Sequence, residues 1–134
     1  MHELVLRIKE PELCYVFARN ATRRGHPELA LQAYRRAVDL RAENHKTGSD
    51  VELSAVRAIY AYEEALSFNK GKRTRATGTW QLVNRHGVLP ALLKRMNSRD
   101  CDEVLPVLKD LGMEDYSFNA VRDAFPDAFT KMAA

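Results

Sequence analysis

Apolar residues recur every three or four positions along most of the chain, which is the period of a helix with one buried face. In residues 51–68 this stripe is formed by Ala55, Ile59, Tyr62 and Leu66. No segment shows the strict apolar–polar alternation of a half-buried strand. The pattern predicts an all-α fold, a compact bundle of about six to eight short helices around one core.

Turn and capping residues divide the apolar pattern into separate helices. Pro11 and Pro27 suit first turns, Ser49 begins a capping box, and Ser117 is a further N-cap. Pro126 is expected to stop the last helix. Asp100 and Glu103 read as a capping pair before a helix that ends near Gly112. The other predicted helices span residues 11–24, 27–46, 51–68, 75–86, 90–96 and 118–125.

The size and composition are those of one globular domain, predicted to span residues 1–134. The N-terminal residues lack the apolar core of a secretory signal, and no apolar run is long enough to span a membrane. Cys14 and Cys101 lie far apart and are interpreted as buried free thiols. These features favour a soluble protein in the reducing cytoplasm.

Charge is distributed unevenly along the chain. Residues 1–64 carry ten basic and ten acidic side chains, whereas residues 65–99 carry eight basic and no acidic ones. Residues 100–134 carry three basic and eight acidic side chains. A basic block of this kind indicates a polyanionic partner, and nucleic acid, either DNA or RNA, is the leading prediction.

The first part of the basic block resembles a phosphate cradle. It contains Gly71 and leads into a predicted helix, whose first N–H groups are free to bind an anion. Arginine can grip a phosphate with two N–H groups, and lysine acts as a point charge. The candidate phosphate ligands here are Lys70, Lys72, Arg73, Arg75 and the hydroxyls of Thr74, Thr77 and Thr79.

The second part of the block resembles a helix-turn-helix with Gly87 at the turn. Leu82, Val88, Leu93 and Met96 fall where that motif packs its two helices together. In this interpretation residues 90–97 form the recognition helix, and arginine would read guanine edges. The candidate nucleic-acid ligands of this part are Arg85, Lys94, Arg95, Asn97 and Arg99.

Trp80 within the block, and Glu63 and Glu64 just before it, are assigned other roles than phosphate ligands. Trp80, the only tryptophan, could stack on a base, but a single Trp at helical spacing is favoured as a core residue. Glu63 and Glu64 precede the block by one or two helical turns and are expected to orient its arginines through ion pairs.

The block YEEALSFNKGKRTRATGTWQLVNRHG resembles a segment of small helical proteins of bacteria. It covers about a fifth of the chain. The resemblance implies no activity, ligand or catalytic residue.

Two alternatives to nucleic-acid binding stay open. The first is a protein-interaction module or inhibitor whose basic surface docks on an acidic partner, or on residues 100–127 of a second copy in a homodimer. The second is a metal-dependent nuclease in which Asp100 and Asp102 bind a divalent ion. The motifs of common hydrolases and nucleotide-binding enzymes are missing, so the chain is predicted to be no enzyme and to need no cofactor.

Overall fold

The computed structural model describes residues 1–133, and this part of the chain is helical without any strand. The all-α fold predicted from the sequence is therefore confirmed. The elements are α1 (Glu3–Leu6), α2 (Pro11–Arg23), α3 (Pro27–Asn44), α4 (Asp50–Lys70), α5 (Thr77–His86), α6 (Val88–Met96), α7 (Arg99–Asp110), the 3-10 helix η1 (Glu114–Tyr116), α8 (Phe118–Ala124) and α9 (Pro126–Ala133).

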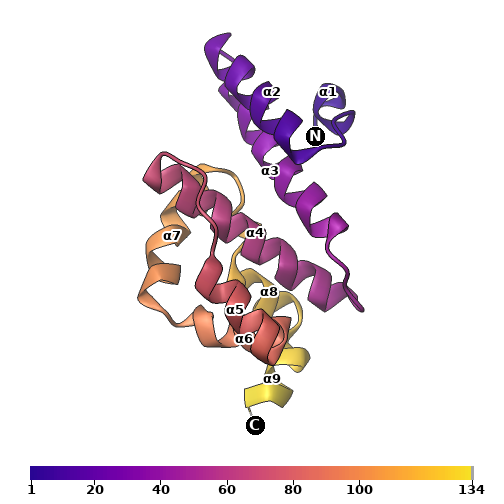
Figure 1. Cartoon of the computed structure of the whole chain (residues 1–134), viewed down its shortest axis with the longest axis vertical. Helices are drawn as coiled ribbons and strands as arrows, with labels where there is room; N and C mark the ends of the chain where they lie inside the picture. Colours follow the sequence, from indigo (N-terminus) through magenta and orange to yellow (C-terminus); the bar gives the residue numbers. More distant parts are fainter. Residues whose placement is uncertain (134) are drawn as a thin grey trace.

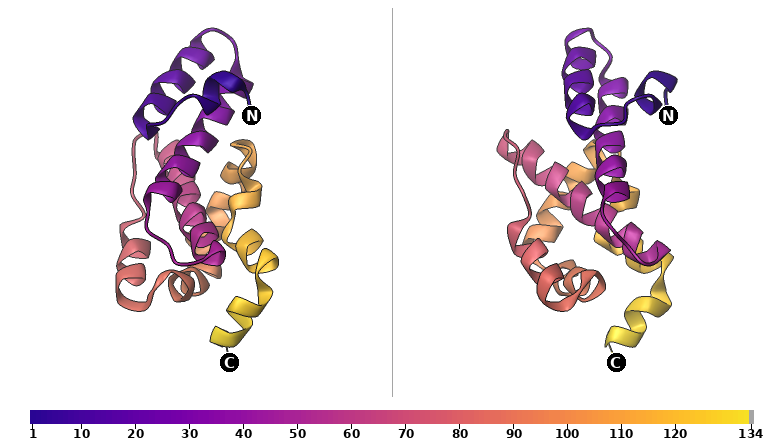
Figure 2. Two further views of the ribbon diagram at one scale, coloured as in Figure 1. Left: turned by 90° about the vertical axis from the view of Figure 1, so that its right-hand side faces the viewer. Right: turned by 45° about the vertical axis from the view of Figure 1, so that its right-hand side comes forward.

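Helices α2 and α3 form a hairpin that stands at one end of the molecule, beside α1 (Figure 1). The views in Figure 2 show that the remaining helices gather around α4 on the other side. The hairpin has a small hydrophobic cluster of its own, in which alanine allows a close approach of the two helices. This cluster consists of Cys14, Ala18, Ala21, Ala30, Ala33, Ala37 and Leu40.

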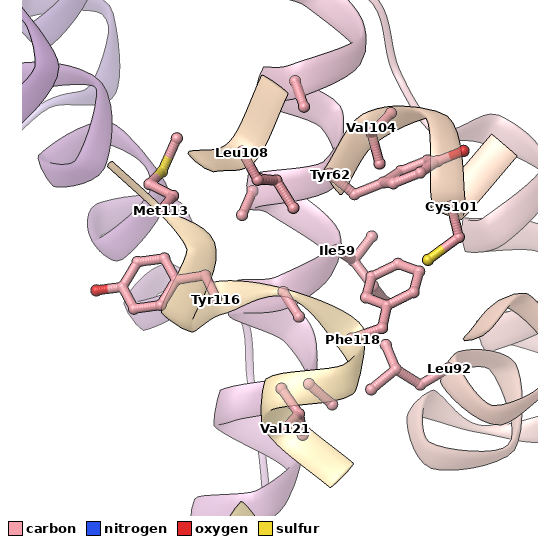
Figure 3. Close-up of a cluster of buried hydrophobic side chains, with 14 of the residues drawn as sticks. Ile59, Tyr62, Leu92, Cys101, Val104, Leu108, Met113, Tyr116, Phe118 and Val121 are labelled. Atoms are coloured by element: carbon pink, nitrogen blue, oxygen red, sulfur yellow. The ribbon is translucent and has the colours of Figure 1, made fainter. Parts of the chain in front are cut away.

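The larger hydrophobic cluster surrounds the central helix α4. Ile59 and Tyr62 of α4 meet side chains from α6, α7 and α8, as Figure 3 shows. The Tyr62 ring stacks on Phe118 with 5.4 Å between ring centres. Cys101 belongs to this cluster and Cys14 to that of the hairpin, and both are buried free thiols, as predicted.

Local signals in the sequence set most helix boundaries correctly. Pro11 and Pro27 each occupy the first turn of a helix, where a missing N–H removes no helical hydrogen bond. The Ser49 hydroxyl accepts a hydrogen bond from the Glu52 N–H, as expected of a capping box. Ser117 caps α8 in the same way, through the Ala120 N–H.

Other predictions about the helices were wrong. The cap of α7 is Ser98, whose hydroxyl accepts from the Cys101 N–H, rather than the pair Asp100 and Glu103. Pro126 begins α9 instead of only ending the helix before it, because a first-turn proline fits a helix start as well as a stop. Helix α6 begins at Val88, two positions before Pro90, so this proline also lies within a first turn.

No helix in the described part of the chain is long and apolar enough to cross a membrane.

Candidate functional site

A cleft separates the α2–α3 hairpin from the C-terminal end of α4 and the loop that follows it. Its volume is about 1240 Å³. The loop, residues 71–76, connects α4 to α5 and forms one wall together with the C-terminal half of α4. The cleft is lined by Glu12, Tyr15, Val16, Arg19, Thr22, Arg23, Tyr34, Arg41, Tyr60, Glu63, Glu64, Ser67, Phe68, Gly71, Lys72, Arg73, Thr74 and Arg75.

Two side chains of α4 hold the 71–76 loop in place. The Glu63 carboxylate accepts hydrogen bonds from the Ala76 N–H at 2.8 Å and from the Trp80 indole N–H at 2.7 Å. The Ser67 hydroxyl accepts from the Thr74 N–H at 2.9 Å and donates to the Glu63 carbonyl. The loop backbone is thus fixed by buried groups at its middle and at its end before any ligand binds.

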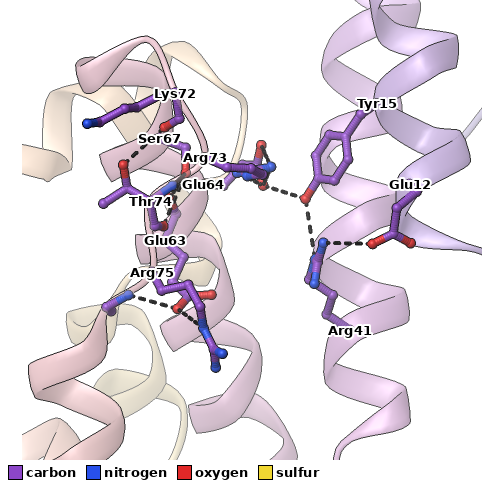
Figure 4. A network of polar contacts seen from close by, with 11 residues as sticks. Glu12, Tyr15, Arg41, Glu63, Glu64, Ser67, Lys72, Arg73, Thr74 and Arg75 are labelled. Atoms are coloured by element: carbon purple, nitrogen blue, oxygen red, sulfur yellow. Dashed lines mark hydrogen bonds and ion pairs between the residues drawn. The ribbon is translucent and has the colours of Figure 1, made fainter.

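Glu64 connects the loop to the hairpin. Its carboxylate accepts from both terminal nitrogens of Arg73, at 3.1 Å for the shorter ion-pair contact, and from the Tyr15 hydroxyl at 3.0 Å. Arg41 donates to the same hydroxyl and pairs with Glu12 at 3.5 Å. Figure 4 shows this chain of polar contacts crossing the cleft.

Two arginines pack near the Tyr15 ring. The Arg73 guanidinium lies 4.4 Å from the ring centre and that of Arg41 lies 5.7 Å from it, both within the range of a cation–π contact. Arg73 therefore both pairs with Glu64 and packs on Tyr15. Such a residue fixes the geometry of the cleft and is only partly available to a ligand.

Burial dominates the protonation of this network. It raises the pKa of Glu64 above its ordinary value, and the positive charge of Arg73 and the Tyr15 hydrogen bond oppose the rise. Burial, followed by the charge of Glu64, raises the pKa of Tyr15 to about 12. The tyrosine hydroxyl therefore keeps its proton and serves as a donor to Glu64 at neutral pH.

Cations line both walls of the cleft. Arg19 and Arg23 project from α2, and Lys72 projects from the loop. Within residues 1–130 none of these three side chains forms an ion pair. Arg75 adds a fourth cation, because it is 78% exposed and lies 3.9 Å from Glu63. The cleft can thus hold an anion between its two walls.

An exposed aromatic ring lies in the same cleft. Phe68, on the last turn of α4, is 55% exposed and meets Tyr34 edge-on with 6.2 Å between ring centres. Val16 of α2 is 46% exposed and lines the cleft as well. The cleft therefore offers apolar surface between its cations.

The structure separates the residues of the predicted phosphate cradle. Lys72, Arg73, Thr74 and Arg75 line the cleft, and Lys70 is exposed at the end of α4 beside it. Thr79 is only 2% exposed, so its hydroxyl is not available to a ligand, contrary to the prediction. It lies in the first turn of α5 and is the one residue of this helix that is buried.

The helix-turn-helix part of the block does not reach the cleft. Arg85, Lys94 and Arg99 are exposed, but none of them lines it. Arg95 covers Gly78 of α5, where an added Cβ would lie 2.5 Å from a guanidinium nitrogen. Its Nε is buried, with no hydrogen-bond partner in the described part of the chain. Arg95 therefore packs α6 against α5, which conflicts with its predicted role in reading bases.

Trp80 and the two glutamates have the roles that the sequence favoured. Trp80 packs against the core, stacks on His45 at 5.4 Å and donates to Glu63. Glu63 and Glu64 pair with Arg75 and Arg73. Both glutamates are buried, which their sequence positions did not indicate.

Helix α2 contributes cleft residues that the sequence reasoning missed. Tyr15, Arg19 and Arg23 are spaced four apart, so they lie along one face of the helix. This spacing was a usable signal. It was overlooked because residues 1–64 have no net charge as a whole.

The candidate metal ligands of the nuclease alternative lie elsewhere. Asp100 and Asp102 are exposed in the first turn of α7. Within the described residues, no group of three or more His, Cys, Asp or Glu side chains is placed to hold a metal ion. The cleft offers cationic and apolar surface for binding, together with the exposed carboxylate of Glu12.

Comparison of the chain with protein-family models, curated proteins and solved structures found no match.

Proposed function

We propose that this protein binds nucleic acid in the cleft between α2 and the 71–76 loop. The observation that carries the proposal is a set of cations that line opposite walls and form no ion pair within residues 1–130, Arg19 and Arg23 on one side and Lys72 on the other. A polyanion lying between the walls would contact both sets at once. Each phosphate that is neutralised releases counterions, and this release favours binding at low salt.

The rigid loop supports the same proposal. Because Glu63 and Ser67 hold the loop backbone, little backbone entropy is lost when a ligand binds Lys72 and Arg75. The carboxylates of Glu63 and Glu64 are occupied by donors from the protein itself. They therefore repel an anionic ligand less than free carboxylates would.

The test is fluorescence anisotropy with labelled single-stranded DNA, double-stranded DNA and RNA over a range of salt concentrations. The cleft variant carries Arg19→Ala, Arg23→Ala and Lys72→Ala. Its matched control carries Arg85→Ala, Lys94→Ala and Arg99→Ala, which removes the same charge from exposed positions outside the cleft.

We expect wild-type affinity to fall steeply with salt. In a plot of the logarithm of the binding constant against the logarithm of the salt concentration, the slope should be about −0.7 to −0.9 per phosphate contact. The affinity of the cleft variant should be lower by at least about tenfold, and its slope should correspond to two or three fewer phosphate contacts. The control should stay much closer to wild type. Equal losses in both variants, or a larger loss in the control, would contradict the cleft as the binding site.

An acidic protein partner, or a second copy of the chain, is the competing use of these cations. Exposed Phe68 favours nucleic acid over that use, since bases stack on aromatic rings. Sedimentation at low and high salt tests self-association directly. A salt-sensitive dimer, together with no binding to any of the three polymers, would replace the proposal by the interaction-module alternative.

A further inference from the structure

Phe68 is the aromatic side chain of the cleft that is most available to a ligand. The Tyr15 ring is covered by Arg73 and Arg41, and Tyr60 packs against Trp80 with 5.0 Å between ring centres. Phe68 touches Tyr34 only edge-on and is 55% exposed. A phenylalanine left this open at the end of a helix has a free face on which a planar group can stack.

The surroundings of Phe68 match the parts of a nucleotide. Val16 of α2, also half exposed, lines the same cleft from the hairpin side. Arg19 and Arg23 lie further along α2, and Lys72 lies four positions after Phe68 along the chain. In such a cleft a base can contact the apolar surface while the phosphates on either side of it contact the cations.

We infer that the cleft takes single-stranded nucleic acid, with an unpaired base stacked on Phe68 and the flanking phosphates held by Arg19, Arg23 and Lys72. This inference rests on the proposed function and deepens it. In a duplex the faces of the bases are covered by their neighbours in the stack, so a duplex has no free base face to offer Phe68. Its phosphates alone could reach the cations.

The packing of α5 and α6 agrees with this choice. A duplex-binding helix-turn-helix would present the side chains of α6 to a major groove. Here Arg95 is turned toward Gly78, with its Nε buried. The described structure thus places the exposed Phe68 ring in the same cleft as Arg19, Arg23 and Lys72.

The experiment compares a labelled oligo-dT strand, a labelled oligo-U strand of the same length and a duplex of equal length, each bound to wild type, Phe68→Ala and Phe68→Tyr. Leu4→Ala is the matched control, since Leu4 is an exposed apolar residue of α1, 49% exposed and outside the cleft. Trp80 fluorescence and circular dichroism verify that each variant is folded.

We expect Phe68→Ala to weaken single-strand binding by about 5- to 150-fold, the range for one stacked base. Phe68→Tyr should retain most of the affinity, because its ring keeps the stacking face. Leu4→Ala should bind like wild type, and the duplex should bind more weakly and respond little to any of these changes. The ratio of oligo-dT to oligo-U affinity identifies the preferred strand.

The failures of the inference and of the proposed function are distinguishable. If the duplex binds as tightly as the single strands and Phe68→Ala changes neither, the single-strand inference is overturned and nucleic-acid binding stands. The same holds if Phe68→Ala and Leu4→Ala lose equal affinity. If no strand and no duplex binds wild type, both are overturned.

Discussion

Replacing Glu63 tests whether the 71–76 loop is held by a buried carboxylate. In Glu63→Ala the Ala76 N–H and the Trp80 indole N–H lose their acceptor, at present 2.8 and 2.7 Å away. A buried donor left unsatisfied costs about 1 to 3 kcal/mol. The indole is only partly buried, so water can replace some of its bond. We therefore expect the free energy of unfolding to fall by about 2 to 4 kcal/mol in total.

Urea denaturation followed by Trp80 fluorescence measures this loss. With a slope of about 2 kcal/mol per molar urea, the midpoint should fall by about 1 to 2 M. Glu63→Gln keeps one oxygen that can accept, and should lose only about 1 kcal/mol. Trp80 is the only tryptophan, so its emission also reports directly on the loop anchor.

The control for this prediction is Glu12→Ala. The Glu12 side chain is 76% exposed and its ion pair with Arg41 measures 3.5 Å, so its loss should change stability by no more than about 0.5 kcal/mol. A Glu63→Ala midpoint equal to that of Glu12→Ala would refute the reasoning. It would mean that the loop is held by other contacts.

Two further predictions concern Glu64 and Arg95. Burial raises the pKa of Glu64, so the folded state keeps the Glu64 proton at a pH where the unfolded state has lost it. Protonation of Glu64 therefore stabilises the folded state at low pH. This contribution is lost as the pH rises from about 4.5 through the raised pKa. The unfolding free energy of wild type should therefore decline with pH relative to Glu64→Gln in urea titrations, and parallel pH profiles would contradict the assignment. Arg95→Met removes a buried Nε that has no partner in the described structure, so thermal unfolding should show a gain of up to about 1 kcal/mol, with nucleic-acid affinity unchanged in anisotropy. A tenfold loss of affinity would instead restore α6 as a recognition helix.

Helix positions could be predicted from the sequence wherever a local signal decided them. Pro27 and Ser117 act on backbone groups within one turn, so their neighbours in sequence determine the outcome. Pro126 shows the limit of this reasoning, because a proline that ends one helix can also begin the next. Which of the two occurs depends on whether the segment after the proline has a surface to pack on. In α9 that contact is made by Phe129, which is buried in the larger hydrophobic cluster around α4.

Only the wall of the cleft that comes from the continuous basic segment, residues 65–99, could be predicted from the sequence. The charge of residues 65–99 indicated the loop, and the spacing of Glu63 and Glu64 indicated their pairing with arginines. The opposite wall comes from α2, and its place across from the loop depends on how the hairpin packs against α4. Burial of Thr79 and the inward turn of Arg95 depend on the same tertiary packing.

From the contacts of Glu64 we expect an order of events during folding. Its partner Arg73 is nine residues away in sequence, whereas Tyr15 is 49 residues away. Closing the longer loop costs about 1.5 kcal/mol more in chain entropy. The ion pair can therefore form while the end of α4 is still open to water, and the hairpin docks on a carboxylate that already has its cation. In this order of closure, the Glu64 carboxylate is paired with Arg73 before the hairpin buries it, so it is never an unpaired charge in the interior.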